Sequence, residues 1–436
     1  MDPNWRFFAF GGGPEPYVPA GFGWMLSVGG SGTDYAYGVD VEGSNIYFCG
    51  YLRVGSYNDA YMAKFNTSGV LQWQRKFLAY SNVHAFDVKI DTQSGSGASS
   101  DVFVGCYAQG AEPAVAKYNQ SGTLQWKERF AVSPTYYAGG LALNSSKAVL
   151  CGKISTSYGI GHVCMFGKSN GSDEGEYSHG YGTSSGFTIQ SYLDCDAEQN
   201  DIFACGMHYV SGGYKGLIAR INNSGTINSH QSFPNCQFYG IKYVLESGNA
   251  RLYVVGKHDS GGAFIFKTNA YGSGNIVWQR RLGTSTSMRW NSVDSDGNDV
   301  FCVGHAPSSD GSNFDIVIAR YTSGGTLERQ MRFASSGNDF AEKIVVDGSF
   351  IYIAGQTTNL SAGGSGEMFL LKLNKGLNNT GDLPNGYSLT NESFATASPY
   401  EQKTNESFTS TSMNSTKTTW NCTEGAASAS TTIKQL

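Results

Sequence analysis

Short apolar runs recur along this chain at a nearly constant interval. Each run is rich in Ile, Val, Phe and Tyr and ends in or beside a glycine. The seven runs are residues 46–50, 102–106, 148–152, 202–206, 252–256, 300–304 and 351–355. From Gly50 to Gly355 the mean interval is about 51 residues, and self-similarity at a fixed period is typical of repeat folds.

Three further elements accompany each run. A second apolar segment follows it and holds one basic residue at a fixed place, and a Ser-Gly or Gly-rich turn comes next. A third segment then contains Trp, as in residues 71–75, 124–127 and 277–280, and a fourth, such as 85–91, precedes the next run. No useful helical periodicity lies between these elements. Four strands per repeat, joined by hairpin turns, predict an all-β fold, a seven-bladed β-propeller.

The two ends of the repeat region predict how the ring closes. The seventh repeat contains only three strands, 343–346, 351–355 and 367–374, and lacks the Trp-bearing one. The N-terminal run 23–27 has no preceding partners and matches the missing strand. We therefore expect Trp24 and Leu26 to complete the last blade, because an open propeller would expose unpaired strand edges.

These motifs carry a family resemblance. Residues 24–50, with Gly-Gly-Ser-Gly-Thr-Asp at 29–34 and the run 46–50, resemble the bacterial SBBP β-propeller repeats. The resemblance covers roughly residues 23–374, although the third and fourth repeats lack the Trp. The run 66–73 is also similar to quinoprotein propeller repeats. Propellers of this kind occur in bacterial surface proteins and in tailed-phage virion proteins, so the resemblance implies one of these settings.

Composition removes several classes of function. The 436 residues include 57 Gly, 26 Tyr and 25 Phe, but only 15% are charged and the net charge is −5. A coiled coil and a disordered charged protein are excluded, and nucleic-acid binding is not expected without a basic excess. No segment approaches eighteen apolar residues and no signal peptide is visible, so we expect no membrane span. The nine Cys include no CxxC pair and favour small buried hydrophobes in a chain assembled in a reducing cytoplasm.

The flanks differ from the repeat region and divide the chain into three parts. We predict an N-terminal docking arm at 1–22, the propeller at 23–374 and a Ser/Thr/Asn-rich C-terminal arm at 375–436. A polar tail of this length needs a cover, either the propeller wall or another subunit, and we favour other subunits. The predicted partner-docking residues are Trp5, Phe7, Phe8, Phe10, Phe394, Phe408 and Trp420.

Candidate chemistry is sparse in this sequence. Residues 294–299 resemble a calcium loop, but the glycine stands in the wrong place and a hairpin turn is favoured. Residues 182–186 match GxSxG without the helix that a nucleophile elbow needs. We interpret His208, His258 and His305 as solvated loop histidines. We expect the recurrent basic residues, which begin with Lys64 and Lys117, to pair with turn carboxylates.

No catalytic residue, metal site or cofactor is predicted. Aromatic residues in the loops that enter the first strand of a blade could stack on a sugar or form a protein contact. The predicted ligand or receptor surface consists of Tyr35, Tyr37, Tyr136, Tyr137, Trp290 and Phe340.

Three functions follow in order of preference. The first is a non-enzymatic structural component of a bacteriophage virion, in the tail or on the capsid surface, with a contribution to host attachment. It would be assembled in the host cytoplasm, with other virion structural proteins in many copies as partners and a host-surface glycan or protein as ligand. The alternative is a bacterial surface or secreted propeller that binds a glycan or protein. The third is a propeller enzyme, which would need convergent acid and base residues around the channel.

Overall fold

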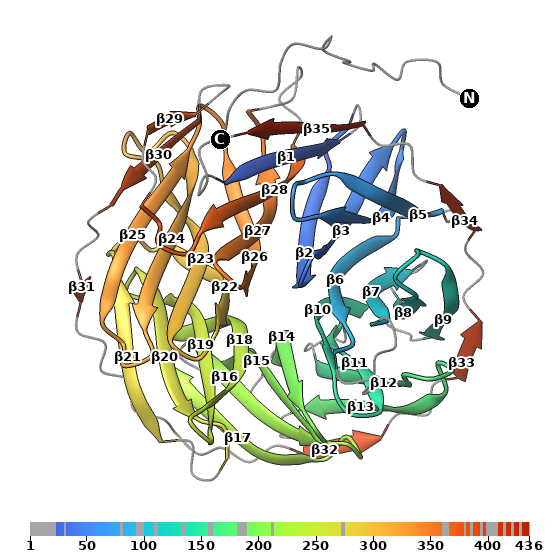
Figure 1. Ribbon diagram of the computed structural model, residues 1–436. Coiled ribbons are helices and arrows are strands. Elements are labelled where there is room, and N and C mark those ends of the chain that lie inside the picture. Colours follow the sequence, from blue (N-terminus) through green and yellow to red (C-terminus); the bar gives the residue numbers. More distant parts are fainter. Residues whose placement is uncertain are drawn as a thin grey trace.

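Antiparallel strands joined by tight turns make up the part of the chain that the computed structural model describes (Figure 1). Residues 1–22 and 436 lie outside that description, as do several internal segments. These segments are 30–31, 79–81, 93–99, 109–111, 132–135, 156–159, 181–189, 211–212, 272–274, 360–365, 379–380, 384–386, 393–395, 398–408, 413–415, 420–422 and 427–429. All seven predicted partner-docking residues and the GxSxG run lie among the residues that are not described.

Seven radial sheets surround a central axis, and each contains four antiparallel blade strands, in chain order except in the blade that β1 completes (Figure 1). The innermost strands are β2 (Tyr35–Glu42), β6 (His84–Ile90), β10 (Tyr136–Leu143), β14 (Gln190–Glu198), β18 (Cys236–Glu246), β22 (Arg289–Ser295) and β26 (Asp339–Asp347). The second strands are β3 (Asn45–Val54), β7 (Val102–Ala108), β11 (Lys147–Ile154), β15 (Asp201–Val210), β19 (Asn249–His258), β23 (Asp299–Pro307) and β27 (Phe350–Thr357). These second strands contain the recurrent apolar runs, so the seven-bladed propeller predicted from them is confirmed.

The outer half of each blade follows the same order. The third strands are β4 (Tyr57–Asn66), β8 (Glu112–Tyr118), β12 (Ile160–Gly167), β16 (Gly213–Asn222), β20 (Ala263–Asn269), β24 (Phe314–Thr322) and β28 (Glu367–Asn374). The fourth strands are β5 (Leu71–Leu78), β9 (Leu124–Ala131), β13 (Asp173–Gly180), β17 (Ile227–Pro234), β21 (Ile276–Leu282), β25 (Leu327–Ala334) and β1 (Trp24–Gly29). We number the blades one to seven from β2–β5 to β26–β28 with β1.

The N-terminal strand β1 completes blade seven, as the sequence predicts. It pairs antiparallel with β28, and Trp24 lies opposite Lys372 while Leu26 lies opposite Leu370. Both side chains are buried, and they pack in a cluster that joins blade seven to blade one. The ring is therefore closed by backbone hydrogen bonds between the two ends of the propeller segment, together with burial of apolar surface.

Apolar clusters between neighbouring blades form the core. One such cluster joins Tyr47 and Met62 of blade one to Val88, Val104 and Tyr118 of blade two. The eight described cysteines are all free and buried, which confirms their prediction as small buried hydrophobes. Because each blade buries one face against each neighbour, no blade has a complete core of its own.

A repeated contact between a Trp and a turn explains two of the sequence motifs. The Nε1 atom of Trp73 donates to the carbonyl of Gln120 at 2.9 Å, and that of Trp278 donates to the carbonyl of Ser323 at 2.9 Å. Each acceptor lies in the turn of the next blade. A Cβ atom at Gly122 or Gly325 in these turns would approach the indole to 2.7 or 2.6 Å, and both glycines have positive φ. The Trp and the Gly-rich turn thus recur together because one packs on the other.

Most of the recurrent basic residues have carboxylate partners, as predicted. Five of the seven form ion pairs, namely Lys117 with Asp101, Lys168 with Asp91, Arg220 with Asp201, Lys267 with Glu246 and Arg320 with Asp299. The other two donate to turn carbonyls of the next blade, Lys64 to Gln120 at 3.2 Å and Lys372 to Thr67 at 2.8 Å. Ion pairing within the ring therefore accounts for most of the fixed charge in the third strands.

The C-terminal segment surrounds the outside of the ring (Figure 1). We call residues 381–435 the C-terminal belt. Its short strands add antiparallel to the fourth strands of blades six, five, three, two, one and seven, in that order. They are β30 (Tyr387–Asn391) on β25, β31 (Thr396–Ala397) on β21, β32 (Thr409–Ser412) on β13, β33 (Thr416–Thr419) on β9, β34 (Thr423–Ala426) on β5 and β35 (Ser430–Gln435) on β1, while β29 (Gly381–Leu383) pairs with β30.

This arrangement corrects our preference for other subunits as the cover of the C-terminal arm. The described belt strands pair with the chain's own blades, because every outer strand presents a free row of N–H and C=O groups. A polar sequence suits this role, since the pairing needs only backbone N–H and C=O groups. The belt ends on β1, so β1 lies between β28 and β35 and three distant segments share one sheet.

Deletion of the belt provides a test of its role. A chain that ends at residue 376 should keep its β-sheet circular dichroism spectrum but melt at a lower temperature and aggregate faster, because six outer strands lose their edge partners. Deletion of 423–436 alone should give an intermediate loss. A full-length melting temperature in the chain that ends at 376 would show that the belt adds nothing to the ring.

Candidate functional site

The innermost strand of every blade contains a β-bulge at the same place. In each case the ladder to the second strand skips one residue, as between Ala36 and Gly38 in β2. A bulge leaves one residue unpaired and changes the direction of its side chain. The skipped residues are Tyr37, Phe86, Gly139, Leu193, Tyr239, Asn291 and Glu342, and all seven line one cavity.

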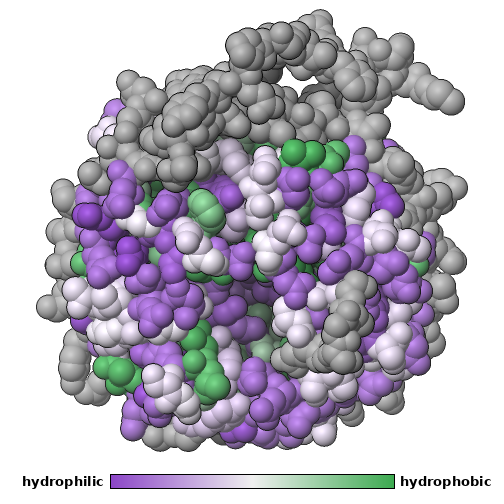
Figure 2. Space-filling model, in the orientation of Figure 1, coloured by the Kyte–Doolittle hydropathy of each residue, from purple (hydrophilic) through white to green (hydrophobic). Residues whose placement is uncertain are grey.

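This channel-mouth cavity has a volume of about 340 Å³. Figure 2 shows the centre of the disc hollowed between the blades. Its remaining lining comes from residues beside the bulges, including Tyr107, Tyr136, Tyr137 and Arg289. Six of the lining residues are therefore aromatic, and the others include a guanidinium, an amide, an ammonium and three carboxyl groups.

A buried ion network forms part of the cavity wall. The Nζ atom of Lys343 lies 3.0 Å from Asp194 Oδ1 and 3.4 Å from Asp87 Oδ2. Burial alone would lower the pKa of Lys343, but the two aspartates outweigh it and raise that pKa well above its usual value. Burial also raises the pKa of Asp194, although Lys343 opposes this shift. The three side chains come from blades two, four and seven and connect them across the axis.

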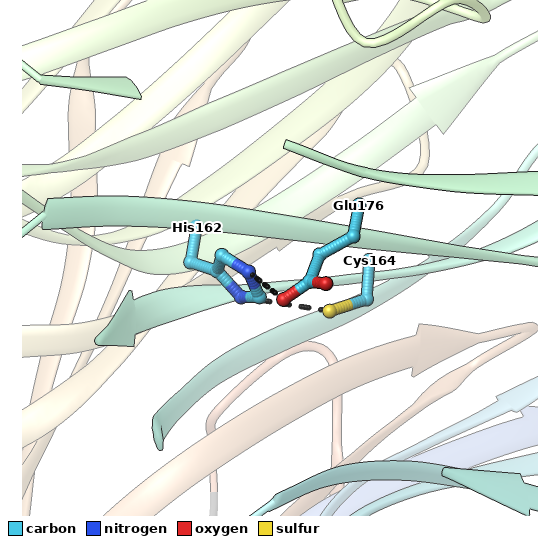
Figure 3. Close-up of side chains that lie close together, drawn as sticks. All are labelled: His162, Cys164 and Glu176. Carbon is cyan, nitrogen blue, oxygen red and sulfur yellow. Dashed lines mark hydrogen bonds and ion pairs between the residues drawn. The ribbon is translucent and has the colours of Figure 1, made fainter. Parts of the chain in front are cut away.

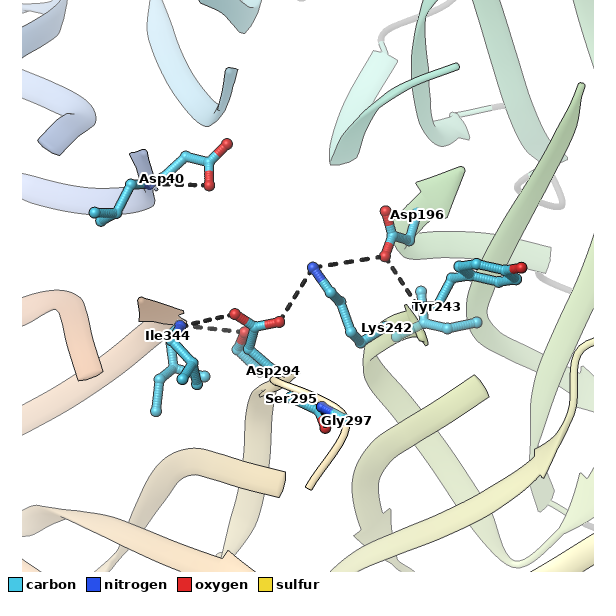
Figure 4. Close-up of polar contacts among 12 residues, drawn as sticks. Asp40, Asp196, Lys242, Tyr243, Asp294, Ser295, Gly297 and Ile344 are labelled. Atoms are coloured by element: carbon cyan, nitrogen blue, oxygen red, sulfur yellow. Dashed lines mark hydrogen bonds and ion pairs between the residues drawn. The ribbon is translucent and has the colours of Figure 1, made fainter. Parts of the chain in front are cut away.

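A second ionic layer lies farther along the channel (Figure 4). Lys242 of β18 approaches Asp294 Oδ1 at 3.1 Å and Asp196 Oδ2 at 3.9 Å. The negative charge of Asp294 is the main reason that the pKa of Lys242 is raised above its usual value. Asp40 projects toward the same region, and burial raises the pKa of its carboxyl group.

The channel carboxylates also connect neighbouring blades. Asp87 accepts a hydrogen bond from the backbone N–H of Leu141 at 3.1 Å, and Asp194 accepts one from Ile241 at 3.1 Å. The other acceptors follow the same rule, with Asp40 bound to Ile90, Asp196 to Tyr243 and Asp294 to Val346 at 2.8–2.9 Å. Because innermost strands of different blades do not pair with each other, these side chains satisfy donors that no ladder reaches.

Several polar atoms at the cavity have no hydrogen-bond partner. They are Nε of Arg289, Oδ1 of Asn291 and the hydroxyl of Tyr136, and each is buried. Asn291 uses its Nδ2 atom to donate to the carbonyl of Ala341 at 2.7 Å and to Glu342 Oε2 at 3.3 Å. Burial raises the pKa of Glu342 to about 7, against the opposing charge of Arg289. The guanidinium of Arg289 lies 4.5 Å above the ring of Tyr239.

An aromatic cluster extends from the cavity over the junction of blades one and two. Tyr37 stacks on Tyr35 at 6.1 Å between ring centroids, and Tyr35 stacks on Tyr51 at 5.2 Å. His84 continues the row, 4.1 Å from Tyr51 and 4.5 Å from Tyr107, which lines the cavity. Burial lowers the pKa of His84 to about 4, so its imidazole is neutral at physiological pH.

The predicted ligand surface is partly assembled by the structure. Tyr37, Tyr136 and Tyr137 line the cavity, and Tyr35 belongs to the adjoining aromatic cluster. Trp290 does not belong to this surface, because it is completely buried between blades five and six. Phe340 is half-buried against His305 and Phe314. All six residues lie in strands and not in the predicted loops.

The histidine interpretation needs a correction. His208, His258 and His305 lie in β15, β19 and β23 and are buried, with exposed fractions of 0–7%. Burial lowers the pKa of His305 to about 3. The second strands continue beyond the apolar runs and include these histidines, so the imidazoles lie within the blades and not in loops. In the calcium-like run, Asp296 accepts backbone N–H groups of Asn298 and Asp299 as a hairpin turn does, in agreement with that prediction.

Sequence reasoning missed Glu342, Arg289, Asn291 and the ion network. The available signal was the alternation of charged residues in the fourth segment of several repeats, as in Asp87 and Lys89. That alternation shows that one face of the strand is polar, but it does not show that these faces meet on an axis.

Comparisons with known proteins assign no function to the chain. No protein-family model matches the chain, and no curated protein sequence is similar to it. Among solved structures, polysaccharide lyase Uly1 gives a TM-score of 0.47 at 8% identity, over 81% of this chain and 99% of the lyase. The phage phi92 endosialidase gives 0.42 at 11%, over 81% and 69%, and the quinohemoprotein alcohol dehydrogenase of Comamonas testosteroni gives 0.45 at 9%, over 82% and 78%. Within the described residues, no helix is long and apolar enough for a membrane crossing.

Removal of Lys343 tests the ion network. In Lys343→Met, Asp87 and Asp194 would face each other without a cation, and we expect a loss of roughly 3–5 kcal/mol of unfolding free energy. The loss should be greater at about pH 8 than at about pH 5, because protonation relieves the repulsion at low pH. Addition of Asp194→Asn should restore part of the stability. Denaturant unfolding measures both effects, and equal losses at the two pH values would contradict them.

Glu342 gives a second prediction about the dependence of stability on pH. Its folded-state pKa of about 7 exceeds the unfolded value, so the folded protein holds a proton that the unfolded chain releases. This group therefore reduces stability as the pH rises through the interval between the two values. Glu342→Gln should flatten the dependence of melting temperature on pH between about 5 and 8, whereas exposed Glu328→Gln should leave it unchanged.

Proposed function

We propose that this protein is a non-enzymatic recognition propeller that binds a carbohydrate in the channel-mouth cavity. The observation that supports this most is the convergence of one bulged residue from each of the seven blades on a single cavity. The repeated backbone fixes these seven positions, while the residue at each position differs, as Tyr37, Asn291 and Glu342 show. A ring built in this way can present a specific surface without changing its fold.

The cavity chemistry favours a sugar. A pyranose ring has an apolar face of C–H groups and an edge of hydroxyl groups. Tyr37, Phe86 and Tyr239 line the cavity with aromatic rings, while Arg289 and Asn291 line it with a guanidinium and an amide group. A volume of about 340 Å³ is at the lower end of the roughly 300–1,000 Å³ typical of ligand pockets. The adjoining Tyr35–Tyr51 cluster would extend the contact to a second sugar unit.

The charges of the cavity favour binding over hydrolysis. Glycoside hydrolysis generally uses two carboxyl groups that act on one bond. Asp87 and Asp194 are both bound to Lys343 and to backbone N–H groups, which leaves Glu342 as the one carboxyl group of the cavity lining that is not paired with a cation. With a pKa of about 7, Glu342 can donate a hydrogen bond to a sugar hydroxyl in its protonated form.

The resemblance of the repeats supports a proposal for the setting of this recognition. We propose a tailed-phage virion, with the propeller on the tail or capsid surface and a host-surface glycan as its ligand. A bacterial surface or secreted location is the alternative. The closed ring and its belt would suit either exposed position, since both remove strand edges. Mass spectrometry of purified particles would identify the chain in a virion.

Binding can be tested on immobilised bacterial capsular and O-antigen oligosaccharides. We expect the full-length protein to retain some of them, with no new reducing ends after long incubation. Tyr239→Ala and Arg289→Ala should weaken binding at least about tenfold, because each removes a cavity wall or its donor. Tyr57→Ala is the matched control, since Tyr57 is 50% exposed and lies outside the cavity. Binding that survives both cavity variants, or release of new reducing ends, would contradict the proposal.

A further inference from the structure

Blade three departs from the other blades at two core positions. His162 lies opposite Gly152 in the β11–β12 ladder, and Cys164 lies opposite Leu150. In the other blades, the residues at the position of His162 are all buried and are Tyr61, Ala114, Leu217, Phe264, Val317 and Phe369. Those at the position of Cys164 are Ala63, Ala116, Ala219, Phe266, Ala319 and Leu371.

The two substitutions in blade three face a carboxylate. Glu176 lies opposite Cys164 on the neighbouring strand β13. The three side chains converge inside the blade (Figure 3), where His162 and Cys164 are completely buried and Glu176 is 3% exposed. The six other blades thus show that the ring folds with apolar residues where blade three has an imidazole and a thiol.

The side chains form a compact cluster of metal-binding atoms. Nε2 of His162 is 2.6 Å from Oε1 of Glu176, and its Nδ1 is 3.5 Å from Sγ of Cys164. One ligand atom from each residue lies within 4.8 Å of the others. A tetrahedral Zn²⁺ with bonds of roughly 2.0–2.3 Å separates its ligands by roughly 3.3–3.8 Å. The imidazole would bind through one of its two nitrogens, and with Nε2 as the ligand the 2.6 Å separation from Oε1 would widen on binding.

Two unsatisfied oxygen atoms border the same cluster. Oε2 of Glu176 and the hydroxyl of Tyr136 are buried without a hydrogen-bond partner. The ring of Tyr136 stands edge-on to that of His162, with 5.5 Å between centroids. A water molecule on a bound cation would donate to such acceptors. Tyr136 also lines the channel-mouth cavity, so a movement of this side chain would give an ion a path from solvent.

We propose that His162, Cys164 and Glu176 bind a Zn²⁺ ion, with a water molecule as the fourth ligand. The combination of nitrogen, sulfur and oxygen donors suits Zn²⁺, whereas Mg²⁺ and Ca²⁺ prefer oxygen donors alone. The thiolate and the carboxylate balance the charge of the cation, so the occupied site is neutral inside an apolar blade. The ion joins β12 to β13 through their side chains and is independent of the proposed carbohydrate site.

The experiment measures zinc in the purified full-length protein. After expression with added Zn²⁺ and exhaustive dialysis, we expect one Zn²⁺ per chain and a higher melting temperature than after chelation. Replacement by Co²⁺ should produce a thiolate-to-cobalt charge-transfer band. Cys164→Ala and His162→Phe introduce residues that other blades hold at these positions, so both variants should fold and should bind zinc at least about tenfold more weakly.

Cys205→Ala is the control, because it removes a buried cysteine from blade four and should leave the zinc content unchanged. A full-length protein that stays free of zinc after Zn²⁺ is added back would overturn the proposal and leave His162 and Glu176 as a buried hydrogen-bonded pair. Full zinc content in Cys164→Ala, or cobalt binding without the charge-transfer band, would also overturn it.

Discussion

The pairing of free strand edges is the constraint on which this structure depends. A radial blade has an outer strand with one unpaired side, and a ring of seven blades has a seam where its first and last blades meet. The chain closes the seam with backbone hydrogen bonds, and the described belt strands pair in the same way with the outer strands of six of the seven blades. Strand β1 closes the seam against β28, and β35 then covers β1. Because β-strand addition needs only N–H and C=O groups, a Ser/Thr-rich segment can serve as the belt.

The contacts that hold the blades together differ with distance from the axis. Far from the axis, the Trp–turn contact recurs in blades one, two, five and seven, and apolar clusters fill the space between neighbouring blades. Near the axis, carboxylates such as Asp87 and Asp194 accept backbone N–H groups of the next blade and bind a shared lysine. This ionic layer fixes the innermost strands next to the bulges, whereas the bulged residues themselves differ from blade to blade.

The two proposed sites depend on this division in different ways. The cavity uses the seven bulge positions, where variation does not disturb the ladders. The cluster of His162, Cys164 and Glu176 lies within the ladders of a single blade, where the other six blades retain apolar side chains at two of the three positions. A polar change inside a blade core destabilises the sheet unless its groups are satisfied, and a bound cation would satisfy all three at once.

The sequence alone determined the strands, their number per repeat, the number of blades and the closing role of Trp24 and Leu26. These features follow from the alternation of apolar and polar residues and from a fixed repeat length. Both can be recognised in a single sequence. Only the tertiary structure decided that Trp290 is buried, that Glu342 and Arg289 share a cavity with Tyr37, and that the belt pairs with its own ring. A bulge turns one side chain to the other face of the strand, and the pattern of hydrophobic residues does not reveal it. Edge pairing uses backbone groups that every residue carries, so the side chains do not predict it.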